Sequence, residues 1–252
     1  MHCAIGQPTF LPWIGWFDLV DQSDVMIILD DVQFSKQTWQ QHNRVRTAHG
    51  LEFLSVPVKT AGRLYQRIID CKLADDRFVK KTIGTLQANY SRAPFFGETF
   101  AELARILKFG ASTASLLELN CELILWMADK LGVTTSMIRA SALAAPGRRG
   151  EHVAAICECV GADTYISPPG AEAYLNEDRT AFDRRGIVIT IHVFEHPEYS
   201  QCFGPFMPYA SALDLIFNTG PAAGQIMRRG RRAARPIVAV SSPPQSNTED
   251  PR

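Results

Sequence analysis

Two short apolar runs near the N-terminus, separated by an amphipathic segment, constrain the fold most. Residues 3–6 are apolar and stop at a proline-containing loop. Residues 25–29 (Val-Met-Ile-Ile-Leu) form a continuous apolar run, which is typical of a strand buried on both faces. Between them, apolar residues recur at helical spacing over 12–20. The order strand, helix, strand predicts an α/β fold with a mainly parallel sheet.

Polar residues follow both predicted strands directly. Gln7 comes after the first strand, and the adjacent carboxylates Asp30 and Asp31 come after the second. In open α/β sheets, ligands bind outside the carboxyl ends of the strands. We therefore place the functional site at this edge.

The rest of the chain alternates between predicted strands and helices. Strands are predicted at 51–58, 68–73, 135–139, 164–167 and 187–194, and helices at 75–90, 100–107, 116–131, 150–160, 171–176, 210–218 and 220–227. The polar stretch 37–46 reads as a loop or short helix near the site. This pattern predicts one α/β domain over 1–228 with a Rossmann-like sheet and an inserted helical subdomain at about 75–132. Few large apolar residues follow, so we expect residues 229–252, rich in Arg, Pro and Ser, to be a disordered tail.

Composition excludes several classes of protein. The 252 residues carry no net charge, which disfavours a nucleic-acid binder working through a basic face. There is no signal-peptide pattern and no apolar run of the roughly 18 residues that a membrane span needs. The six cysteines are scattered and read as reduced thiols, so a cytoplasmic protein with no metal centre is expected.

Three residues are candidates for proton transfer. Asp30 and Asp31 could orient an amine, a sugar hydroxyl or Mg²⁺, or one of them could act as a general base. The alternative is that one caps a helix and the other is solvated. His196 lies in a loop dense in Pro, Gly and aromatic residues, and its ordinary pKa near neutrality suits acid–base work. A structural histidine is the alternative there.

Other residues are candidates for substrate binding. Lys36, Arg44 and Lys59 could clamp a phosphate or carboxylate, although a solvated face explains them equally well. We expect hydrogen bonds or ring stacking from the remaining candidates, which are Gln7, Pro12, Trp13, Gln33, Trp39, Asn43, Tyr199 and Gln201. Trp16 repeats with Phe17 and Val20 at helical spacing, which favours a core role. No Walker loop, dinucleotide fingerprint or serine-hydrolase elbow is present.

These motifs resemble the WbqC-like family of bacterial proteins. The resemblance rests on Gln7-Pro8 with Leu11-Pro12-Trp13-x-Gly15, Leu29-Asp30-Asp31-Val32-Gln33-Phe34-Ser35-Lys36, Trp39-Gln40, Asn43-Arg44, Val56-Pro57-Val58-Lys59, Tyr165-Ile166-Ser167, Ala173-Tyr174-Leu175 and His196-Pro197-x-Tyr199-x-Gln201, with Asp214, Phe217, Asn218 and Gly220. It covers about 3–228. One position departs, because Gly6 stands where the family usually has His.

A weaker resemblance is to nucleotidyltransferase (HUP-like) folds, in which a His-x-Gly-His motif holds nucleotide phosphates at a helix N-terminus. Here Trp13 and Trp16 occupy the two histidine positions. A nucleotide with Mg²⁺ is therefore a cofactor that the fold could accept, whereas adenylyl transfer by the histidine mechanism does not follow.

The WbqC resemblance implies a role in O-antigen, glycan or specialised-metabolite biosynthesis. We expect an enzyme of group transfer or amide-bond formation on an amino- or hydroxyl-bearing small molecule, such as a nucleotide-activated sugar. The alternative is a non-catalytic nucleotide-sugar or small-molecule binding protein, or a partner subunit. The expected partner is the small molecule, with no nucleic acid and no membrane, and a homodimer is left open.

Overall fold

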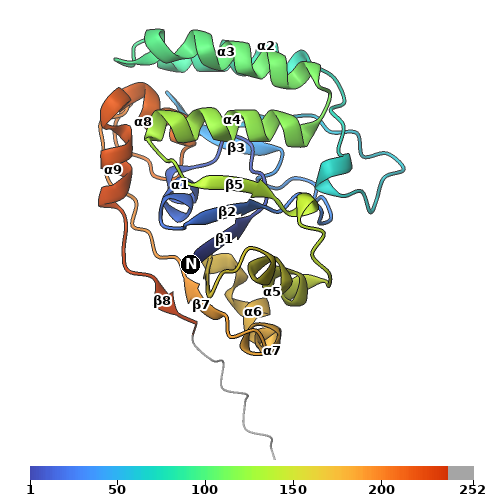
Figure 1. The fold of residues 1–252 in the computed structure, drawn as a ribbon. Helices are drawn as coiled ribbons and strands as arrows, with labels where there is room; N and C mark the ends of the chain where they lie inside the picture. The colour runs from blue at the N-terminus through green and yellow to red at the C-terminus, as the bar shows by residue number, and fades with distance from the viewer. Residues whose placement is uncertain (238–252) are drawn as a thin grey trace, which may run out of the picture.

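A six-stranded sheet forms the centre of the computed structural model, which describes residues 1–237 (Figure 1). The strand order is β5-β2-β1-β6-β7-β8. The strands are β1 (His2–Gly6), β2 (Val25–Ile28), β5 (Ser136–Arg139), β6 (Thr164–Ser167), β7 (Val188–Ile191) and β8 (Arg235–Pro236). All neighbours pair in parallel except β7 and β8, which are antiparallel. The expected α/β fold with a mainly parallel sheet is confirmed.

The sheet is buried on both faces, which explains the continuous apolar runs. In β1, Cys3 and Ile5 point into one apolar cluster, while Ala4 points into the other. Ala4 is aligned with Met26 of β2 and Ile166 of β6, so equivalent positions of three strands face the same side. Alternation of side chains along each strand thus supplies two separate cores.

Helices cover each face in turn (Figure 1). One face packs against α1 (Ile14–Asp21), α4 (Leu116–Leu131), α8 (Ala212–Thr219) and α9 (Ala223–Arg229). The other packs against α5 (Arg149–Cys159), α6 (Glu172–Glu177) and α7 (Arg179–Asp183), of which α7 was not predicted. Short 3₁₀ turns lie at Ala140–Ala142, Pro169–Ala171 and Gly220–Ala222.

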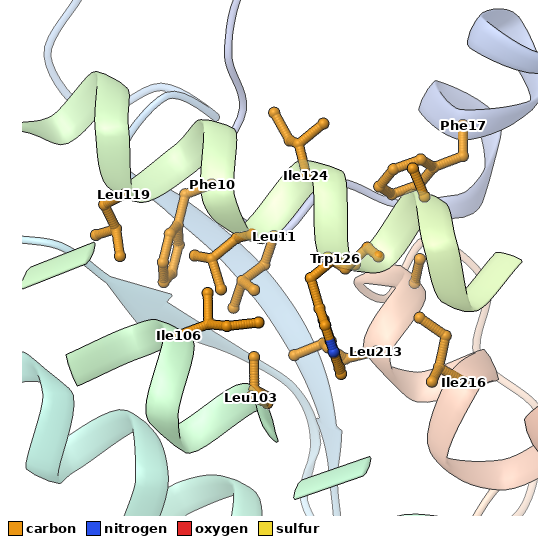
Figure 2. Packing of buried hydrophobic residues seen from close by; sticks show 14 of the residues in the cluster. Phe10, Leu11, Phe17, Leu103, Ile106, Leu119, Ile124, Trp126, Leu213 and Ile216 are labelled. Carbon is orange, nitrogen blue, oxygen red and sulfur yellow. The ribbon is translucent and has the colours of Figure 1, made fainter. Parts of the chain in front are cut away.

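An outer layer of two helices completes this side of the sheet; the second packs directly on α4, and the first packs on the second. These are α2 (Arg77–Tyr90) and α3 (Phe96–Ser112), which lie beyond α4 as seen from the sheet (Figure 1). Figure 2 shows α4 side chains meeting Leu103 and Ile106 of α3 and Leu213 and Ile216 of α8. Helix α4 is therefore apolar on more than one side, as its sequence indicated. The helical segment predicted near 75–132 corresponds to α2–α4, between β4 and β5.

The segment 37–46, expected to be a loop or short helix, instead enters a strand. It begins the antiparallel hairpin of β3 (His42–Thr47) and β4 (Gly50–Ser55). Val45 is the one apolar residue of β3, so the strand has almost no hydrophobic pattern to identify it. The strand predicted at 68–73 was also wrong, since Ile68–Asp70 is a 3₁₀ turn.

The chain stays structured beyond residue 228, which corrects the start of the expected tail. Arg231 donates to Asp18 Oδ1 at 2.9 Å and also pairs with Asp21, while Arg228 Nε lies 2.8 Å from Asp21 Oδ2. Asp18 is fully buried and lies 2.9 Å from His192 Nε2. These ion pairs fix 228–231 against α1, and β8 then joins the sheet. The remainder of the predicted tail, 238–252, lies outside the described residues.

None of the helices within 1–237 combines the length and the apolar character that crossing a bilayer requires.

Candidate functional site

A crevice opens between the carboxyl ends of β1 and β6. From β1 the chain moves through β2 to β5 in one direction, and it then returns past β1 to β6 and β7. Connections therefore leave these two neighbouring strands toward opposite sides. Such a switch in direction is where open α/β sheets bind ligands.

A pocket of about 530 Å³ occupies this crevice, and we call it the large compartment. Gly6 and Gln7 line it after β1, and Pro168 and Gly170 line it after β6. Aromatic side chains complete much of its wall, namely Trp16, Trp39, Tyr165 and Tyr174. The lining is thus apolar and aromatic with a few neutral polar groups, which is the usual character of a small-molecule site.

A second pocket of about 200 Å³, the small compartment, adjoins the first. It is lined by Thr9, Trp13, Trp39, Asn43, Arg44 and Tyr209. Thr9 and Trp39 also line the large compartment, so the two pockets meet at these side chains. We refer to the two adjoining compartments together as the cleft.

Hydrogen bonds fix the loop that follows β1. Gln40 Nε2 donates to Gln7 Oε1 at 2.6 Å. Asn120 of α4 donates through Nδ2 to Pro8 O at 2.9 Å and to Gln40 O at 2.8 Å. Pro12 is buried, and its carbonyl accepts from Ala212 N at 2.8 Å, so it holds α1 against α8 and does not line the cleft.

Arg44 brings a positive charge into the small compartment. Its guanidinium lies over the Trp39 ring, 5.5 Å from the centroid. Its Nε is buried and has no hydrogen-bond partner in the structure. The neighbouring Asn43 is buried and donates through Nδ2 to Phe10 O at 3.1 Å, while its Oδ1 accepts from Arg44 N at 2.9 Å. Asn43 thereby positions the backbone that carries Arg44.

The two carboxylates after β2 have different environments. Asp30 is fully buried, and its two oxygens accept from Ser141 N at 2.9 Å and Ser141 Oγ at 2.7 Å. This carboxylate tethers the 3₁₀ turn after β5. Asp31 is partly exposed and lies 3.2 Å from His152 Nε2 of α5. Neither carboxylate lines either compartment, although Leu29, which precedes Asp30, and Val153, which follows His152, line the large one.

His152 is the functional candidate that sequence reasoning missed. Its Nδ1 faces Ala145 O at 3.1 Å, opposite the contact to Asp31. The residue lies in an apolar helical stretch without any motif, so only the proximity of α5 to the end of β2 identifies it.

His196 lies in a cage of aromatic rings behind the small compartment. Its ring stacks on Trp13 and Tyr199, with centroids 6.2 and 6.1 Å away. Nδ1 donates to Pro197 O at 3.0 Å, and the buried Nε2 has no partner. Burial lowers the pKa of His196, so its ring is held neutral.

Tyr199 and Gln201 hold the same loop through a buried carboxylate. Asp214 of α8 accepts from Tyr199 Oη at 2.8 Å, Gln201 Nε2 at 2.7 Å and Tyr90 Oη at 2.8 Å. Burial raises the pKa of Asp214, and these three donors oppose that shift. Both predicted residues therefore point into the protein and do not line the cleft.

The remaining polar candidates lie outside both compartments. Lys36 and Lys59 are exposed, and the Lys59 backbone N–H bonds Lys72 O at 2.9 Å. Gln33 is also exposed and donates through Nε2 to Leu64 O at 3.2 Å, which anchors the loop near 62–66. Of the predicted binding residues, the structure thus brings together Gln7, Trp13, Trp39, Asn43 and Arg44.

Within 1–237, no group of three or more His, Cys, Asp or Glu side chains is arranged to hold a metal ion.

Comparison with known proteins identifies the family. The sequence model of the WbqC-like protein family matches residues 7–226. An uncharacterized protein of Mycobacterium tuberculosis (strain ATCC 25618 / H37Rv), Rv1507c, is 34% identical over 230 residues, which cover 91% of this chain and 98% of the relative. No solved structure matches the chain. The chain belongs to the WbqC-like protein family.

Proposed function

We propose that this WbqC-like protein is a biosynthetic enzyme that transfers a group to, or forms an amide bond on, an amino- or hydroxyl-bearing small molecule. The observation that carries the proposal is the large compartment at the switch point of the sheet. Counting the parallel strands in chain order, the sheet reads 3-2-1-4-5, which is the order of Rossmann-like doubly wound sheets. Glycan or specialised-metabolite synthesis is the role that we infer.

The lining supports a ring-bearing polar substrate such as a nucleotide-activated sugar. Trp16, Trp39 and Tyr174 offer ring faces, and the amides of Gln7 and Gln40 offer hydrogen bonds. A volume of about 530 Å³ falls within the range of small-molecule sites.

Proton transfer is assigned to Asp31, with His152 as its partner. The carboxylate is partly exposed at the end of β2 but does not line the large compartment, so this role requires a substrate that extends past Leu29 and Val153 to reach Asp31. Asp30 is saturated by Ser141, and we assign it the role of positioning residue. His196, although neutral, lies behind Trp13 and Tyr209, which leaves it a supporting role in the wall.

A non-catalytic binding protein is the second candidate, and one observation favours it. Among the described residues that line the large compartment, there is no carboxylate, histidine, lysine or arginine. A carrier or sensor of a small molecule needs none. The two functions differ in whether a product forms.

Gly170 provides a test of the site. A Cβ added to this glycine would meet nothing within 4 Å, so Gly170→Leu adds a large side chain to the wall of the large compartment without a backbone clash. Gly84→Leu in α2, where a Cβ also meets open space, is the matched control. A thermal-shift screen with nucleotides and nucleotide sugars should find compounds that raise the melting temperature of the wild type and Gly84→Leu but not of Gly170→Leu. Equal shifts in all three proteins would refute this location.

Product analysis separates the two functions. Compounds found in the screen are incubated with candidate amino and hydroxyl acceptors, and mass spectrometry detects any new product. An enzyme should give product with the wild type and little with Asp31→Asn, while both proteins still bind the compound. Binding without product across the acceptor panel would favour the carrier.

All six cysteines are free thiols in the structure, which supports the cytoplasmic location that we propose.

A further inference from the structure

We propose that the small compartment binds a carboxylate or phosphate that is attached to a flat ring, with Arg44 as the anion-binding residue. This inference rests on the proposed function, since the same cleft would hold the rest of the substrate. It adds a chemical class to that substrate: an anionic, ring-containing metabolite.

Arg44 is a charged group without a counterion. Within 1–237, no ion pair involves Arg44, and none of the six residues that line the small compartment is acidic. Most of the other arginines within 1–237 pair with carboxylates, as Arg139 does with Glu118. A lone guanidinium at the wall of a pocket leaves an uncompensated positive charge there, and an anion would complement it.

The hydrogen bonding of the Arg44 guanidinium gives a second argument. Its Nε is covered by protein atoms, and among residues 1–237 no side chain or carbonyl accepts a hydrogen bond from the guanidinium. Its outer nitrogens are not covered in this way, so they are the donors that a ligand in the small compartment would meet. The planar guanidinium suits two-point contact with a carboxylate or phosphate.

The walls of the compartment favour a ring beside the anion. Trp39 and Tyr209 are 48% and 51% exposed, although large aromatic side chains are usually more buried. Trp13 lies against Tyr209, with ring centroids 5.4 Å apart. These ring faces would stack on a planar ligand ring or on the apolar face of a sugar.

The hairpin braces this arrangement. His42 and Phe53 lie beside Trp39 on its outer side, with centroids 5.8 and 6.2 Å from it. The ring of Trp39 is therefore supported by aromatic neighbours on the hairpin and by the cation of Arg44. A volume of about 200 Å³ accommodates one ring and its anionic group, while the rest of a larger substrate would pass Thr9 toward the large compartment.

The experiment compares charged and neutral ring compounds by isothermal titration calorimetry at low salt. Benzoate and phenyl phosphate are the anionic probes, and benzamide is the uncharged analogue of benzoate. Arg44→Gln removes the charge, and Arg105→Gln changes an exposed arginine of α3 as the matched control. Trp39→Ala removes one wall.

We expect both anions to bind the wild type and Arg105→Gln at least about tenfold more tightly than they bind Arg44→Gln, because a charge-assisted hydrogen bond is lost. Benzamide should bind the wild type more weakly than benzoate. Trp39→Ala should weaken phenyl phosphate more than inorganic phosphate. The inference is overturned if the wild type ignores both anions, if benzamide equals benzoate, or if Arg44→Gln binds benzoate as the wild type does.

The test of the anion site can fail or succeed independently of the test of the proposed function. If Gly170→Leu abolishes binding of a screened compound while the wild type ignores benzoate and phenyl phosphate, the anion site fails and the cleft stands. If the anions bind through Arg44 while Gly170→Leu changes nothing, the anion site stands and the proposed function fails.

Discussion

His152 Nε2 lies 3.2 Å from Asp31 Oδ1, and the Nδ1 of the same ring lies 3.1 Å from Ala145 O. Both ring nitrogens therefore face oxygen acceptors. A neutral imidazole carries one N–H and can satisfy only one of them, whereas an imidazolium satisfies both. The contact also ties α5, on one face of the sheet, to the carboxyl end of β2.

A double-mutant cycle measures this pair. Asp31→Ala and His152→Ala should each lower the free energy of unfolding by about 1–3 kcal/mol, because each leaves a partly buried partner without its bond. The double variant should lose less than the sum of the two, with a coupling of about 1 kcal/mol or more. Urea denaturation gives all four values, and strict additivity would show that the two side chains do not interact.

The contact of Arg231 with Asp18 should matter more for stability than surface ion pairs do. Asp18 is fully buried, so Arg231→Met would leave that carboxylate short of a donor and should cost about 2–4 kcal/mol. Arg184→Met is the matched control, because Arg184 is 68% exposed in its pair with Glu151 and should contribute under about 1 kcal/mol. Equal urea midpoints for both variants would contradict the ranking.

Acid should destabilise the protein partly through His196. Burial lowers its pKa in the folded state below the ordinary value of 6.5, so the unfolded chain binds the proton more readily. The neutral ring makes its full contribution to the free energy of unfolding above pH 6.5, and this contribution is lost as the pH falls below that value. The free energy of unfolding of the wild type, measured relative to that of His196→Phe, should therefore fall as the pH is lowered from about 7.5 to about 5.5. A pH-independent difference would show that the ring is not held neutral.

Two glycines should respond to alanine in opposite directions. Gly220 has φ +51°, and an added Cβ would lie 2.4 Å from the Phe95 ring, so Gly220→Ala should cost about 2–4 kcal/mol. Gly84 lies inside α2 with open space around it, so Gly84→Ala should gain about 0.5–1 kcal/mol. Thermal unfolding of both variants tests the pair, and a destabilised Gly84→Ala would contradict the helix argument.

Sequence patterns predicted the elements that hydrophobic burial dominates. The runs that became β1 and β2 are buried on both faces, and the helix predicted at 116–131 matches α4. The hairpin strand β3 was missed because Arg44 and Arg46 look like surface residues. Arg46 is in fact buried, and it donates to the carbonyls of Thr47 and the loop at 203–205.

Residue roles were harder to predict than elements. The sequence placed Asp30 and Asp31 at a strand end, but it could not show that Ser141 saturates one and His152 meets the other, since both partners are distant along the chain. Tyr199 and Gln201 looked like loop ligands because nothing local indicated that Asp214 of α8 accepts from both. Arg44 was recognised as a cation, whereas its lack of a counterion is visible only in three dimensions.

The strand order has one consequence for how the substrate site could diversify. Gly6 and Gln7 come from the N-terminal half of the chain and Pro168 and Gly170 from the C-terminal half, so the opposing walls of the large compartment are encoded by separate stretches. Replacement of one stretch by recombination would change the residues of one wall and leave the opposite wall unchanged. Relatives could in this way differ in substrate specificity while they keep the pairing of β1 with β6.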